Sequence, residues 1–86
     1  MKTGQWVITR GIAAKIKRDE DFAFFVMQSV DKYLRKDWGD TCEEDSALND
    51  AAVKNGDDRI VARYDNIFII TEWNRSVTTI LFTEEY

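Results

Sequence analysis

The last third of the chain contains three β-favouring runs joined by very short connections, and this feature restricts the fold most. Residues 59–64, 67–73 and 76–82 are rich in isoleucine, valine, threonine and aromatic residues. Asp65-Asn66 and Asn74-Arg75 each suit a two-residue hairpin turn, because Asn and Asp tolerate positive φ. Parallel neighbours would need a crossover of a dozen or more residues. The sequence therefore predicts an antiparallel three-stranded meander.

Helical periodicity before the meander predicts further elements. Residues 5–9 are a β-favouring run bounded by glycines, which indicates a first strand or an extended segment. A short helix should begin near Gly11 and end in the charged stretch 17–20. Residues 20–36 predict a longer helix, whose acidic first turn and basic last turn suit the helix macrodipole.

A capping-box pattern indicates a third helix. Thr41 stands three residues before Glu44, so the Thr41 side chain is expected to accept from the Glu44 amide while the Glu44 carboxylate reaches back. The helix should end at Asn55-Gly56, because glycine supplies the left-handed residue at many helix C-termini. The predicted order β-α-α-α-β-β-β is an α+β fold: a mostly antiparallel sheet, in which the N-terminal strand joins the meander, with three helices packed on one face.

The chain has room for one domain and one hydrophobic core. Its 86 residues are 44% hydrophobic and 33% charged and include no proline, repeat or low-complexity linker. A domain of this size buries only about 60% of the surface that its unfolded chain exposes. The predicted sheet also leaves one face open, with Val61, Arg63 and threonines on it. We therefore expect a modestly stable single domain, residues 1–86, that uses this face to form a homodimer or to dock.

The side chains that catalysis usually needs are scarce. There is no histidine, which removes the commonest general base and zinc ligand, and Ser29, Ser46 and Ser76 have no imidazole to activate them. The carboxylates of residues 37–45 lack the Asp-x-Asp-x-Asp-Gly spacing of a calcium loop. We expect no enzyme activity, no cofactor and no metal site; a small metal-dependent enzyme remains as an alternative.

The single cysteine, Cys42, cannot form an intramolecular disulfide, which is typical of a protein in a reducing compartment. We expect it to be buried as a small apolar side chain. The longest apolar runs, residues 22–27 and 67–70, are far shorter than the roughly 20 residues of a membrane-spanning helix. The expected location is cytoplasmic, without membrane contact.

Charge is distributed unevenly along the chain. Residues 1–36 carry eight bases and four acids, a net charge of +4. Residues 37–58 carry eight acids and one base, Lys54, a net charge of −7. We call residues 37–58 the acidic pole. Because the whole chain has a net charge of −4, we expect no direct contact with nucleic acid.

The acidic pole is the predicted contact surface for a protein partner. A compact acidic surface competes for a groove that is built to hold phosphates. The alternative is that these acids only keep the protein soluble. Phe24 is a second candidate contact, since helical spacing places it among polar residues on the outer face of its helix. The predicted partner-binding residues are Asp40, Glu43, Glu44, Asp45, Asp50, Asp57, Asp58 and Phe24.

A series of short sequence blocks extends over nearly the whole chain. The blocks are Thr3-Gly4-Gln5, Val7-Ile8-Thr9-Arg10-Gly11-Ile12-Ala13, Asp37-Trp38-Gly39-Asp40, Cys42-Glu43-Glu44-Asp45, Asn49-Asp50, Lys54-Asn55-Gly56-Asp57, Ile69-Ile70-Thr71-Glu72, Arg75-Ser76-Val77-Thr78-Thr79-Ile80-Leu81-Phe82 and Glu84-Glu85-Tyr86. In this order they resemble short plasmid-related proteins carried by mobile elements of Gram-positive gut bacteria. The resemblance implies a role that such elements need, such as control of transfer, plasmid upkeep or the blocking of host defence nucleases.

Charge, composition and resemblance lead to one functional expectation and one alternative. The expectation is a non-enzymatic protein-binding module that inhibits a host DNA-directed defence protein, of the anti-CRISPR or anti-restriction type, by phosphate mimicry. The alternative is a dimeric structural or regulatory accessory protein for plasmid transfer or maintenance, which docks through Phe24 and the open sheet face.

Overall fold

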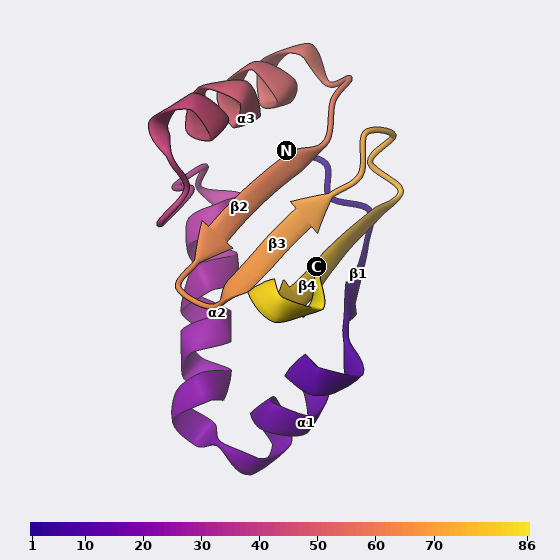
Figure 1. The fold of residues 1–86 in the computed structure, drawn as a ribbon. Coiled ribbons are helices and arrows are strands. Elements are labelled where there is room, and N and C mark those ends of the chain that lie inside the picture. The colour runs from indigo at the N-terminus through magenta and orange to yellow at the C-terminus, as the bar shows by residue number, and fades with distance from the viewer.

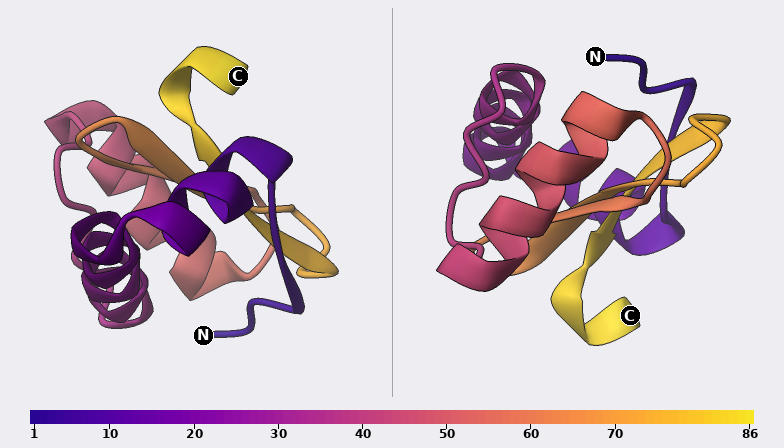
Figure 2. Two further views of the ribbon diagram at one scale, coloured as in Figure 1. Left: turned by 90° about the horizontal axis from the view of Figure 1, so that it is seen from below. Right: turned by 90° about the horizontal axis from the view of Figure 1, so that it is seen from above.

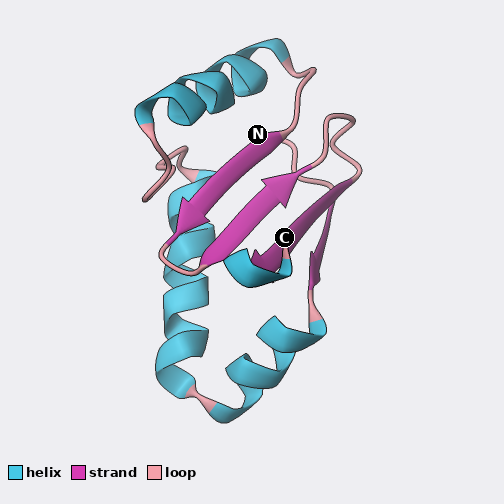
Figure 3. Ribbon diagram, viewed as in Figure 1, coloured by secondary structure: helices cyan, strands magenta, loops and turns pink.

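The computed structural model describes residues 1–86 and contains three helices and four strands (Figures 1 and 3). The elements are β1 (Gln5–Ile8), α1 (Arg10–Arg18), α2 (Glu20–Leu34), α3 (Glu43–Asn55), β2 (Ile60–Tyr64), β3 (Ile67–Thr71) and β4 (Val77–Phe82), followed by the short 3-10 helix η1 (Thr83–Glu85). This order confirms the predicted α+β fold. None of the helices combines the length and the apolar composition of a membrane-spanning segment.

The strands form one mixed sheet in the order β1-β4-β3-β2. The predicted meander is confirmed, because β2 pairs antiparallel with β3 and β3 pairs antiparallel with β4. The N-terminal strand β1 joins the outer side of β4 in parallel orientation. Parallel pairing is possible here because the three helices and two other strands separate β1 from β4 along the chain.

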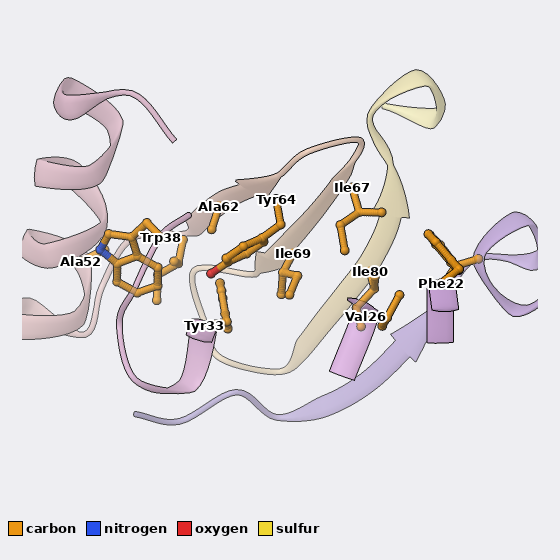
Figure 4. Packing of buried hydrophobic residues seen from close by; sticks show 12 residues of the cluster. Phe22, Val26, Tyr33, Trp38, Ala52, Ala62, Tyr64, Ile67, Ile69 and Ile80 are labelled. Carbon is orange, nitrogen blue, oxygen red and sulfur yellow. The ribbon is translucent and has the colours of Figure 1, made fainter. Parts of the chain in front are cut away.

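Alternation along the strands decides which side chains enter the core. The inward-facing residues of β2, β3 and β4 meet the buried faces of α1 and α2 (Figure 4). The buried cluster contains Ile12, Phe22, Val26, Tyr33, Trp38, Ala52, Ile60, Ala62, Tyr64, Ile67, Ile69 and Ile80. On α2 the inward residues follow helical spacing, which is why residues 22, 26, 29 and 33 are buried while Phe24 is exposed, as expected.

The helices do not all lie on the same side of the sheet plane. Helix α2 lies on one side and η1 on the other, as the two views in Figure 2 show. Helix α3 runs beside the edge strand β2, which refines the prediction of three helices over one face. The outer sheet face is partly covered by the C-terminus, since the Tyr86 ring lies edge-on to Phe68 at 5.4 Å between centroids.

Local side-chain bonds explain where the first two helices begin. The Thr9 hydroxyl accepts from the Ile12 amide at 3.3 Å, and the Asp19 carboxylate accepts from the Phe22 amide at 3.1 Å. The third helix, α3, ends as the sequence predicts, because Gly56 at its C-terminus adopts a left-handed conformation with φ 71°.

One hairpin turn matches the prediction and the other does not. Asp65, with φ 55°, and Asn66 connect β2 to β3 directly. The predicted two-residue turn at Asn74-Arg75 is wrong, because the last ladder bond joins the Glu72 amide to the Val77 carbonyl and leaves a four-residue loop, 73–76. The Arg75 guanidinium explains the longer loop: it donates to the carbonyls of Trp73 at 3.1 Å and Ala52 at 2.8 Å, which ties the loop to α3.

Candidate acidic interface

Near its N-terminal end the acidic pole contains a short segment, residues 38–41, that pairs with the edge of β2. The Asp40 amide donates to the Arg63 carbonyl at 2.8 Å, and the Arg63 amide donates to the Thr41 hydroxyl at 2.9 Å. The Asp40 carboxylate then accepts from the Asp65 amide at 2.7 Å. These bonds fix the segment that leads into α3.

Helix α3 is fixed to the same strand by the side chain of Asn49. The Asn49 amide group donates to the Val61 carbonyl at 2.9 Å, and its oxygen accepts from the Val61 amide at 3.1 Å. Asp50, the next residue, accepts from the Trp38 indole at 2.9 Å, while Ala52 is buried in the core cluster. The sequence analysis did not identify Asn49 as a residue that attaches α3 to the sheet. The one signal in the sequence was its position as a polar residue on the otherwise apolar side of the helix.

The predicted capping box is absent. Cys42 is the N-cap of α3, and its side chain makes no capping hydrogen bond. Thr41 is engaged elsewhere, because its hydroxyl donates to the Trp38 carbonyl at 2.6 Å and accepts from Arg63. Cys42 is exposed, which also corrects the expectation that it is buried.

The structure divides the predicted acidic contact residues into two groups. Asp40, Asp50 and Asp58 accept hydrogen bonds from Asp65, Trp38 and Arg59 respectively, so they contribute to the fold. The second group makes no side-chain hydrogen bond or ion pair, and all its members are exposed: Glu43, Glu44, Asp45 and Asp57.

Three of the free carboxylates stand together in the first turn of α3, at residues 43–45. Their position favours the helix macrodipole. The salt bridge of the protein, Arg35 to Asp31 at 3.0 Å, lies on α2, so no base forms an ion pair with this turn, although Arg59 and Arg63 line hollows that Asp45 also lines. The acidic pole is thus a solvated surface of like charge.

Two neighbouring hollows lie between α3 and the outer sheet face, and both are lined by Asp45 and Val61. One has a volume of about 320 Å³ and includes Leu48 and Tyr86. The other has a volume of about 450 Å³ and includes Phe68. Their linings combine an apolar floor with carboxylates and with Arg59 and Arg63 at the margins. No group of three or more His, Cys, Asp or Glu side chains is arranged to hold a metal ion.

Phe24 is not brought together with the acidic pole. It belongs to the first part of α2, which lies at the opposite end of the molecule from α3 (Figure 1). Its side chain is 60% exposed, and Met27, one turn further along α2, is 69% exposed. Phe24 and Met27 therefore form a separate apolar patch.

Titration behaviour is altered at two core tyrosines. Burial raises the pKa of Tyr33 to about 12, despite its hydrogen bond of 2.7 Å with the Thr71 hydroxyl. Burial also raises the pKa of Tyr64, whose hydroxyl donates to the Asp37 carbonyl at 2.7 Å. The Thr71 hydroxyl also forms a hydrogen bond of 2.7 Å with the Thr78 hydroxyl. These buried hydroxyls do not line either hollow and serve the core.

Comparison with family models, curated proteins and solved structures found no match to this chain.

Proposed function

We propose that the chain is a non-enzymatic protein-binding module whose acidic pole occupies the basic groove of a DNA-directed defence protein of the host. The resemblance to plasmid-related proteins supports the setting, because mobile elements encounter such defences. The acidic pole then acts as a phosphate mimic, and the inhibition is of the anti-CRISPR or anti-restriction type.

The observation that carries the proposal is the group of free carboxylates at residues 43–45. They are exposed, adjacent and without a hydrogen-bond or ion-pair partner in the protein. Like charges at this density repel one another, and the helix dipole recovers only about 0.3–1 kcal/mol for each. A basic groove would turn that repulsion into binding energy and speed encounter.

The length of the acidic pole fits this partner. Helix α3 has 13 residues, which at about 1.5 Å per residue gives about 20 Å of axis. One strand of duplex DNA carries a phosphate about every 3.4 Å, so about six phosphates span the same distance. Four of the predicted acidic contact residues lie on the helix itself, and Asp40, Asp57 and Asp58 lie just beyond its two ends.

The test is capture followed by competition. Immobilised protein is incubated with host lysate, and bound proteins are eluted with duplex DNA and identified. The proposal expects a DNA-binding nuclease or surveillance subunit, released by the duplex and bound more weakly as salt rises. Retention of the bound protein in excess DNA would overturn phosphate mimicry.

Two matched double variants distinguish an effect on the partner-binding surface from an effect on the stability of the protein. Glu43→Gln with Glu44→Gln removes two acids from the first turn of α3, and Glu20→Gln with Asp21→Asn removes two from the first turn of α2. Both pairs lose a similar dipole interaction. Only the α3 pair should lose the captured nuclease; equal loss from both would point to a general charge effect and against this surface.

The second candidate function is the dimeric accessory protein, and the exposed patch of Phe24 and Met27 favours it. Large apolar side chains exposed one turn apart are typical of a contact surface. Sedimentation velocity at rising protein concentration tests this. Self-association that Phe24→Ala abolishes, together with full activity of the α3 pair, would favour the accessory role over the inhibitor.

A further inference from the structure

The two edge strands of the sheet, β2 and β1, differ in whether their outward backbone groups are hydrogen-bonded. The β2 edge is closed: Asn49 bonds both backbone groups of Val61, Thr41 accepts from the Arg63 amide, and Gly39 forms a bridge with Arg63. An unpaired edge is a template for pairing with another chain, so such closure prevents unwanted association.

The β1 edge has no comparable cover. The amides of Gln5 and Thr9 donate to the Ser76 and Ile80 carbonyls of the β4 side, each at 3.1 Å. Because alternate residues of a strand direct their backbone groups to opposite sides, Trp6 and Ile8 present their N–H and C=O groups outward. No element lies beyond β1 on this side (Figure 1), and neither view in Figure 2 places one there.

The side chains along this edge fit an added strand. Val7 is 37% exposed and Ile8 is 45% exposed, and the two project to opposite faces of the sheet. Apolar side chains on both faces allow alternate residues of an extended peptide to make contact on either side. The edge also lacks proline and the inward-facing lysine that commonly block pairing.

Charge decides between two occupants of this edge. Lys2 precedes β1 and Arg10 follows it in the sequence, and residues 1–18 contain five bases and no acid, although the Glu85 carboxylate accepts from the Thr9 hydroxyl at the Arg10 end. A second copy pairing antiparallel would bring the Lys2 end of each strand toward the Arg10 end of the other, and like charges would meet twice. An extended segment with acidic residues at its ends instead carries charge opposite to that of Lys2 and Arg10.

We propose that the β1 edge binds an extended segment of a partner protein, with β-branched residues in its centre and acidic residues at its ends, by adding a strand to the sheet. This contact does not involve the acidic pole, so it stands or falls independently of the proposed function.

The test uses two synthetic peptides of alternating valine and threonine, one with glutamates at both ends and one with lysines. Binding is followed by the amide resonances of the full chain during titration, a method that detects weak complexes. The proposal expects saturable shifts at Trp6 and Ile8 with the glutamate peptide, slower exchange of those two amides, and at least about tenfold weaker binding of the lysine peptide. Unchanged Trp6 and Ile8 amides, or equal binding of both peptides, would overturn it.

Three variants test whether the peptide binds at the β1 edge. Ile8→Pro removes an outward amide without touching the bonds to β4, and should abolish the shifts. Lys2→Glu with Arg10→Glu keeps the backbone intact and should reverse the preference between the peptides, which decides the question if Ile8→Pro does not fold. Glu43→Gln with Glu44→Gln should leave peptide binding unchanged. A dimer that Ile8→Pro dissociates would show that a second copy, and not an acidic segment, occupies the edge.

Discussion

The side chain of Asn49 hydrogen-bonds both the N–H and the C=O of Val61, at 3.1 and 2.9 Å. An asparagine amide has the same donor and acceptor as a backbone peptide group, so one residue of α3 takes the place of a neighbouring strand. Asn49 is buried, at 3% exposure, although it belongs to an otherwise acidic helix. This pairing attaches the acidic pole to the sheet.

Replacement of Asn49 by alanine should therefore destabilise the protein. Two hydrogen bonds are lost and two backbone groups of β2 are left without partners, which should lower the free energy of unfolding by about 1–3 kcal/mol. Urea denaturation measures the change. Gln28→Ala, at an exposed position of α2, is the control and should stay within about 0.5 kcal/mol. A similarly small effect of Asn49→Ala would mean that water replaces the amide.

Gly39→Ala should cost more than Gly56→Ala. Both glycines have positive φ, 62° and 71°, so each alanine suffers the left-handed penalty of about 1–2 kcal/mol. A Cβ at Gly39 would also overlap the Tyr64 ring and the Arg63 carbonyl, whereas a Cβ at Gly56 meets nothing within 4 Å. Thermal unfolding of the two variants gives the comparison. Equal losses would show that residues 38–41 move away from β2 easily.

Alkaline pH should unfold the protein in part through Tyr33. Its pKa is 10.0 when unperturbed and about 12 in the folded protein, because burial disfavours the phenolate. The unfolded state therefore loses its proton first. Stability from this group is complete below pH 10 and declines as pH rises toward 12, by about 2–3 kcal/mol in total. Tyr33→Phe should reduce the slope of unfolding free energy against pH in this range; an unchanged slope would assign it to other groups.

Phe24→Ala should leave stability almost unchanged. The ring is 60% exposed and lies outside the core cluster, so its loss should alter the free energy of unfolding by less than about 0.5 kcal/mol. Urea denaturation at low protein concentration measures the monomer. Val26→Ala, a core change on the same helix, provides the contrast and should cost more. A loss of comparable size for Phe24 would show that the ring packs within the monomer and is not reserved for a partner.

The predictions that the structure confirmed rest on sequence patterns whose physical cause lies within a few residues of each other. The strand-forming runs, the Asp65-Asn66 turn and the glycine end of α3 depend on backbone preferences of the residues themselves. The exposed position of Phe24 followed from helical spacing alone. The acidic pole could likewise be located from charge counts, since no folding is needed to see it.

The failures came from residues whose partners are distant in sequence. Thr41 satisfies the capping pattern, yet its hydroxyl is taken by Arg63 of β2, 22 positions away. Arg75 extends its hairpin loop because its guanidinium reaches Ala52, 23 positions away. The sequence around each of these side chains suggests one local hydrogen bond. In the folded protein the same side chain bonds a distant residue instead, and the local sequence contains no sign of that partner.

Backbone preference, periodicity and charge were sufficient to predict the fold class, the meander and the acidic pole from the residues alone. The tertiary fold set which carboxylates remain free, since Asp40 and Asp50 are held by groups far along the chain while Glu43 and Asp45 are not. It also decided that one sheet edge is closed by Asn49 and the other left open at β1. Strand order is set by which long-range pairings bury the most apolar surface together, and no local spacing encodes that choice.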